Sequence, residues 1–205
     1  MTSKLIVAFG LLLMATTHGA QATTAPAMPP QAALCGSCHG PQGLGVEPLG
    51  PRLAGLSSEY IQKQIKDFQS SKRQNPTMTP MAMTLQGDAL IAQVADYFAA
   101  QAVPSVSIQR RGEQVTFKDS AEQLAYQGDW SRELPACVTC HGPSGIGAGT
   151  FPRLAGQQAS YLKSQLLAWQ AGTRQGDSDS MMANVANKLS AAEIDAIAHY
   201  FANLK

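Results

Sequence analysis

The chain has 205 residues, of which 15 are Lys or Arg, 14 are Asp or Glu, and only 14% are charged in total. This near-neutral balance excludes nucleic-acid binding through a basic stripe, which needs clustered Lys and Arg. It also argues against strong electrostatic steering of a partner protein.

The N-terminus has the pattern of a secretory signal. Lys4 precedes an apolar run at residues 5–14, and residues 20–22 fit a small-x-small cleavage site. The run is shorter than the about 20 residues that a membrane-spanning helix needs. We therefore expect residues 1–22 to be a signal peptide that is removed, with cleavage after Ala20 as the alternative, and a product that is exported without an integral membrane segment.

An internal duplication organises the rest of the chain. The stretch around Cys35 matches the stretch around Cys137, and Pro-Arg-Leu-Ala-Gly occurs at residues 51–55 and again at 152–156. Further matches follow in the same order, which is the signature of two copies of one unit. The predicted organisation is an N-terminal domain at 23–102, a linker at 103–115 and a C-terminal domain at 116–205.

Each copy is predicted to be helical, so the fold class is all-α. In the first copy, residues 58–70 place apolar side chains at the helical period, and residues 90–100 form a second amphipathic helix. The second copy repeats the first of these helices and ends with a helix at residues 192–204, before which Ser190 and Glu193 have the spacing of a capping box. A further helix is expected from about residue 120, whereas its equivalent before Cys35 is poorly marked.

All four cysteines lie in Cys-x-x-Cys-His motifs, one in each copy. A disulfide in each pair and a structural zinc site that uses both pairs are the alternatives. Neither explains why a histidine follows each pair. Covalent haem explains every residue, because two thiols add to the porphyrin vinyl groups and the adjacent histidine ligates the iron. We expect two haem c groups, attached at four cysteines and ligated by two histidines: Cys35, Cys38, Cys137, Cys140, His39 and His141.

The second axial ligand of each iron follows by elimination. After the signal segment only His199 remains besides the two motif histidines, and no cysteine is spare. Methionine remains, and a His/Met pair suits electron transfer. Counting back seven residues from Leu85 and Leu189, where the last helices approach, selects Met78 and Met182. Two neighbouring methionines remain as alternatives, Met81 and Met181.

These motifs together resemble the dihaem cytochrome c4 family, and the likeness covers nearly all of the chain after the signal. The resemblance implies two class I cytochrome c domains in tandem, related by a pseudo-twofold axis, with the haem propionates near the interface. It also implies that the carbonyl groups of Pro51 and Pro152 accept hydrogen bonds from the motif histidines. Arg73 and Arg174 recur at equivalent positions and could pair with propionates or lie in solvent. Packing roles are favoured for the two tyrosines and two tryptophans considered: Tyr60, Tyr161, Trp130 and Trp169.

With both irons fully ligated, the predicted function is electron transfer and not catalysis. The resemblance implies a periplasmic carrier that takes electrons from a quinol-oxidising complex or a small electron carrier and passes them to a terminal oxidase. A peripheral association with the membrane is compatible with this role. The alternative is a dihaem subunit of a larger redox enzyme, such as a flavocytochrome sulfide dehydrogenase.

Overall fold

The computed structural model describes residues 27–108 and 116–204, so the predicted signal peptide and most of the predicted linker lie outside the described residues. In this part of the chain the regular structure is helical, and the few β-bridges are isolated. The all-α prediction is therefore confirmed. None of the helices in the described ranges is long and apolar enough to cross a membrane.

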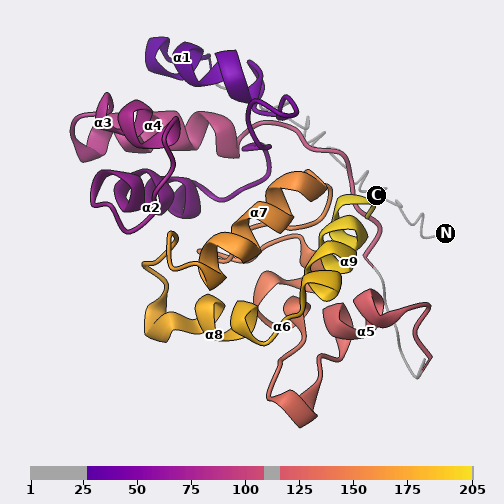
Figure 1. The fold of residues 1–205 in the computed structure, drawn as a ribbon. Coiled ribbons are helices and arrows are strands. Elements are labelled where there is room, and N and C mark those ends of the chain that lie inside the picture. The colour runs from indigo at the N-terminus through magenta and orange to yellow at the C-terminus, as the bar shows by residue number, and fades with distance from the viewer. Residues whose placement is uncertain (1–26, 109–115, 205) are drawn as a thin grey trace, which may run out of the picture.

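The first copy consists of four α-helices, which occupy the indigo to magenta part of Figure 1. Their bounds are α1 Pro30–His39, α2 Ser58–Gln69, α3 Met78–Met83 and α4 Asp88–Ala99. The helix before Cys35, which no apolar periodicity marked, begins with Pro30 at its first turn, where a proline costs no backbone hydrogen bond. Helix α3 was not predicted from the sequence, because six residues are too few to show a helical period.

The second copy repeats this arrangement and adds one helix at its start. Its α-helices are α5 Ser120–Tyr126, α6 Cys137–His141, α7 Ala159–Gln170, α8 Met181–Asn187 and α9 Ala191–Ala202. Short 3₁₀ turns lie between them: η1 Trp130–Arg132, η2 Pro143–Gly145 and η3 Ser178–Ser180. Helix α7 contacts both α8 and α9, just as α2 contacts both α3 and α4. The expected helix near residue 120 and the Ser190–Glu193 capping box are both present.

Each copy has its own hydrophobic core. Phe98 of α4 is fully buried in the first core, and Phe201 of α9 is 1% exposed in the second. Both phenylalanines press against a glycine of the loop that follows the cysteine motif: a Cβ atom at Gly43 or Gly145 would lie within 2.8 Å of the ring. Because these glycines also have positive φ, the loop can pass close to the core only with glycine there.

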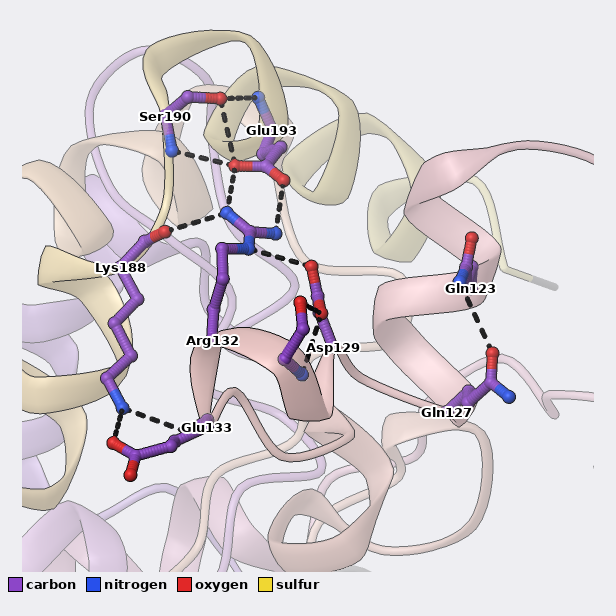
Figure 2. A network of polar contacts seen from close by, with 9 residues as sticks. Gln123, Gln127, Asp129, Arg132, Glu133, Lys188, Ser190 and Glu193 are labelled. Atoms are coloured by element: carbon purple, nitrogen blue, oxygen red, sulfur yellow. Dashed lines mark hydrogen bonds and ion pairs between the residues drawn. The ribbon is translucent and has the colours of Figure 1, made fainter.

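A polar network ties the segment before the second cysteine motif to α9 (Figure 2). Arg132 of η1 binds Asp129 at 2.8 Å, Glu193 at 2.7 Å and the carbonyl oxygen of Lys188 at 3.0 Å. This anchoring holds Trp130 on the surface with 71% of its area exposed. The packing role expected for Trp130 is therefore wrong within this chain, since its turn is fixed by the charged contacts of Arg132 and not by burial of the indole.

The two copies pack against each other through the start of α2 and α7 (Figure 1). Ser57, the N-cap of α2, donates to the carbonyl oxygen of Gly149 in the other copy at 2.5 Å. Gln158, the N-cap of α7, donates to the carbonyl oxygen of Gly50 at 3.1 Å. Equivalent residues thus reach equivalent loops in opposite directions, as expected for copies related by a pseudo-twofold axis.

Candidate haem-binding sites

Two short helices present the cysteine motifs. Cys35, Cys38 and His39 lie at the end of α1, and the second motif forms the whole of α6. Among the described residues the four cysteines are free, so no disulfide joins them. The described residues also contain no cluster of three or more potential metal ligands from His, Cys, Asp and Glu. The arrangement does not fit a zinc site built from both motifs, because each motif packs in its own core.

Cys35 and Cys137 are in surroundings that favour the uncharged form of the thiol. Burial raises the pKa of Cys137 to about 11 and also raises the pKa of Cys35. A thiol with a raised pKa is a poor free nucleophile and a poor metal ligand at neutral pH. The surroundings of these two thiols therefore do not activate them for redox exchange.

Each motif histidine is held by a backbone carbonyl. The Nδ1 atom of His39 lies 2.7 Å from the carbonyl oxygen of Pro51, and the Nδ1 atom of His141 lies 2.8 Å from that of Pro152. These are the contacts that the family resemblance implied. With Nδ1–H donating to a carbonyl, Nε2 keeps its lone pair for a metal on the opposite edge of the ring.

Burial also keeps the imidazoles neutral. It lowers the pKa of His39 and of His141 below the ordinary histidine value, and the charge of the nearby arginine in each copy acts in the same direction. The bond to the proline carbonyl opposes this shift without reversing it. Neutral imidazole is the form that ligates iron.

Gly50 allows the first of these carbonyls to come close. A Cβ atom on Gly50 would lie 2.7 Å from the carbonyl oxygen of Cys38 and 3.0 Å from Nδ1 of His39. The equivalent position in the second copy is Phe151, and the proline after it makes the same contact with His141. The close approach at Gly50 is therefore a feature of the loop in the first copy.

A cavity of about 260 Å³ adjoins the second motif. Its lining includes Cys137, Cys140 and His141 together with Met181 and Met182. Further lining residues come from α7, from α8, from α9, from the connection between α8 and α9, and from α2 of the first copy: Leu162, Leu166, Trp169, Val185, Leu189, Ile197, Tyr60 and Gln64. Two thiols, a neutral imidazole and a thioether around one apolar cavity fit a covalently attached haem. The cavity is bordered by both copies, so this site lies beside their interface.

The methionine-bearing helices are equivalent in the two copies. Gln69 donates to the carbonyl oxygens of Ala82 at 2.9 Å and Leu85 at 2.7 Å. In the second copy, Gln170 makes the same pair of bonds to residues 186 and 189, at 2.8 and 3.0 Å. Residues 82 and 186 therefore correspond, and the same offset pairs residue 78 with residue 182.

The backbone N–H of each of these methionines is also held in the same way. Asn75 Oδ1 accepts from Met78 N at 2.8 Å, and Asp177 Oδ2 accepts from Met182 N at 2.5 Å. The second loop is longer and passes through two consecutive residues with positive φ, Asp179 and the residue after it. Met78 packs against the first core, whereas Met181 is 40% exposed. Both observations support the choice of Met78 and Met182 over their neighbours.

The structure brings the other recurring candidates together in one place. Arg73 and Arg174 are both buried between the copies, with 7% and 8% of their areas exposed. Each guanidinium also lies over an aromatic ring of its own copy, Phe68 at 4.5 Å and Trp169 at 4.9 Å from the ring centre. The alternative that these arginines are solvated at helix ends is wrong, because the packing of the two copies encloses them.

Sequence reasoning missed the partners of these arginines. Tyr60 and Tyr161, for which simple packing was favoured, accept hydrogen bonds from the arginine of the opposite copy. Gln64 and Gln165 accept from both arginines. The only signal in the sequence was that the Tyr and Gln positions recur in the repeat.

Comparisons with known proteins agree with the duplicated architecture. The family model described as cytochrome c matches residues 18–100 and 132–205. A thiosulfate dehydrogenase electron acceptor from Stutzerimonas stutzeri is 41% identical over 85% of this chain and 81% of its own length. A cytochrome c4 from Pseudomonas aeruginosa is 37% identical over 98% of this chain and 99% of its own length.

Solved structures give the same two kinds of relative. Reduced recombinant cytochrome c4 from Pseudomonas stutzeri aligns with a TM-score of 0.73 at 31% identity, covering 85% of this chain and 95% of that one. Thiosulfate dehydrogenase (TsdBA) from Marichromatium purpuratum aligns with a TM-score of 0.74 at 44% identity over 83% of this chain. The match spans only 36% of that longer chain.

Proposed function

We propose that this chain, which belongs to the dihaem cytochrome c4 family of c-type cytochromes, is a periplasmic electron carrier that accepts electrons from a thiosulfate dehydrogenase. The family carries two covalently bound haem c groups, one in each copy. The observation that carries the proposal is the duplicated set of thiols, carbonyl-held histidine and methionine found in both copies.

The residues of the chain have distinct roles at each haem. Cys35 and Cys38 attach the first group through their sulfur atoms, and Cys137 and Cys140 attach the second. The motif histidine would ligate the iron, with its ring oriented by the bond to a proline carbonyl. Bound haem c supplies a one-electron iron couple. The surrounding apolar side chains exclude water, which favours the less charged, reduced state.

A carrier is favoured over an enzyme by the methionines. With Met78 and Met182 as the further ligands, neither iron would keep an open coordination position for a substrate. The relatives point the same way, since they are named as cytochrome c4 and as electron acceptors of an enzyme. The export signal predicted at residues 1–22 supports a periplasmic location.

The donor is inferred from two kinds of relative. The Stutzerimonas stutzeri protein is named as the electron acceptor of thiosulfate dehydrogenase. In the Marichromatium purpuratum protein, a region similar to this chain is part of a longer chain that is itself a thiosulfate dehydrogenase. Covalent linkage keeps a donor and its acceptor at high effective concentration. We propose that a thiosulfate dehydrogenase is likewise the electron donor here, and that a terminal oxidase accepts the electrons.

The surface around each cysteine motif is suited to brief, weakly charged encounters. Residues 134–152 contain no Lys, Arg, Asp or Glu, and residues 27–51 contain only Glu47. Large apolar side chains are exposed in these segments, with Leu34 at 55% and Leu49 at 64%. Docking through such patches gives fast dissociation, which a carrier that must serve two partners requires.

Rapid mixing tests this proposal. The oxidised holoprotein is mixed with a thiosulfate dehydrogenase, with and without thiosulfate, and haem reduction is followed by absorbance. We expect both haems to be reduced only when thiosulfate is present. Reduction by a quinol-oxidising complex but not by the dehydrogenase would overturn the donor assignment. Failure of the protein to exchange two electrons reversibly with any mediator would overturn the carrier function itself.

A further inference from the structure

Arg73 and Arg174 are equivalent in the repeat and are also each other's neighbours in space. Their backbones form an antiparallel β-bridge between the two copies. A hydrogen bond flanks this bridge on each side. Gln74 N donates to the carbonyl oxygen of Thr173 at 2.9 Å, and Gln175 N donates to the carbonyl oxygen of Lys72 at 2.6 Å. Equivalent residues can pair in this way only beside the pseudo-twofold axis.

The two guanidinium groups share the same acceptors. Gln64 Oε1 accepts from Arg73 at 3.0 Å and from Arg174 at 3.1 Å. Gln165 Oε1 accepts from the same two arginines, at 2.6 and 3.1 Å. Two like charges are therefore held on either side of the same two amide oxygens.

Each arginine is also anchored in the opposite copy. Arg73 donates to Tyr161 Oη at 2.8 Å, and Arg174 donates to Tyr60 Oη at 2.9 Å. Burial acts to raise the pKa of Tyr161, but the charges of Arg73 and Arg174 together lower it below its ordinary value. Both guanidinium charges therefore act on the same buried hydroxyl group, that of Tyr161.

No carboxylate side chain of the described residues forms an ion pair with either arginine. Asp67 acts on Arg73 from a greater distance, but its Oδ2 atom is already paired with Lys63 at 2.6 Å. A buried charge interacts strongly with other charges nearby, because little solvent screens it.

Both haem sites adjoin this pair. Arg73 acts electrostatically on His39, and Arg174 acts on His141. Arg174, Tyr60 and Gln64 line the same cavity as His141 and the second pair of cysteines. Since the guanidinium groups share their acceptors, a charge change at either one is close to both sites.

We propose that Arg73 and Arg174 form one shared positive centre that raises the reduction potentials of both haems together, so that neither arginine serves only its own copy. This inference rests on the proposed function, because it requires two haems that exchange electrons. An oxidised haem carries one more positive charge than a reduced haem, so a nearby buried cation favours reduction. Loss of either arginine charge therefore lowers both potentials.

A spectroelectrochemical titration of the dihaem protein tests this with Arg73→Gln and Arg174→Gln. At a fixed ambient potential we expect the oxidised-to-reduced ratio of both haems to rise about tenfold in each variant, which corresponds to about 1.4 kcal/mol. Lys72→Gln is the matched control, since it removes the same charge from the exposed residue beside Arg73 and should leave both potentials unchanged. A variant in which only one potential moves, or neither, would overturn the inference.

A second substitution covers the case in which an arginine variant does not mature with two haems. Gln64→Glu keeps the shape of the side chain but places a negative charge between the two guanidinium groups. Both potentials should again fall, whereas an unchanged potential at either haem contradicts a shared centre. A wild-type protein that does not titrate as two one-electron couples would contradict the carrier function itself, and the inference with it.

Discussion

Gln170 donates a hydrogen bond to the carbonyl oxygen of Ala186 at 2.8 Å, and Gln69 makes the equivalent bond in the first copy. This bond places α8 on α7 and so sets the register of the methionine helix against the cavity. It supports the proposal that Met78 and Met182 are the iron ligands, which leads to the first prediction.

Replacing Met78 or Met182 by alanine should remove one methionine–iron bond while both haems stay attached. We expect the methionine–iron charge-transfer absorption of the oxidised protein to fall by about half in each variant, and the potential of that haem to drop. Met81→Ala and Met181→Ala are the matched controls, which should keep the full absorption. If a control variant loses the band while the Met78→Ala or Met182→Ala variant of the same copy keeps it, the control methionine is the iron ligand instead.

Attachment of the second haem should be required for the C-terminal copy to fold. Its core contains several small buried residues, including Ala121, Ala125 and Ala198, and the cavity beside the motif would otherwise be empty. In the Cys137→Ser/Cys140→Ser variant we expect the C-terminal copy to lose its cooperative thermal transition, measured by circular dichroism, while the first haem remains. A native-like transition of the haem-free copy would show that its apolar core suffices.

Electron transfer from the proposed donor should depend only weakly on ionic strength. The segments that surround both cysteine motifs carry almost no charge, so there is little field to screen. We expect the second-order rate constant to change by less than about threefold between 10 and 150 mM salt, measured by rapid mixing. A steep fall with added salt would indicate that charged residues elsewhere steer the encounter.

The network in Figure 2 should make the stability of the protein sensitive to acid. The bond to Arg132 lowers the pKa of Glu193 from its ordinary 4.5 to about 2, with Ser190 adding to the effect. A carboxylate with a lowered pKa stabilises the fold fully above its unfolded pKa and loses that contribution as the pH falls toward its folded pKa. Denaturant stability should therefore decline as the pH falls from about 5 to about 2.

The Arg132→Gln variant should show a smaller decline over the same pH range, because its Glu193 has lost the main partner. Lys66→Gln is the control, since it removes an ion pair to Asp88 whose partners are largely exposed, and its pH profile should follow the wild type. An Arg132→Gln profile that matches the wild type would mean that other carboxylates control the acid sensitivity.

Part of the structure could be predicted from local sequence patterns alone. The attachment motifs, the helices at residues 58–69 and 191–202, and the Ser190 capping box depend on residues within a few positions of each other. The repeat then established that there are two equivalent units. Such features are visible in the sequence because their physical cause, helical periodicity or the reach of neighbouring side chains, is itself local.

The placement of one copy against the other is not local, and only the tertiary structure decided it. The sequence by itself determined that the chain attaches two haems at Cys35–His39 and Cys137–His141, since the chemistry of each motif lies within five residues. It left Arg73 and Arg174 undecided between solvent and haem. The folded structure buries both on the pseudo-twofold axis, because their partners Tyr161 and Tyr60 lie about ninety or more residues away in the opposite copy and meet them only when the two cores pack together.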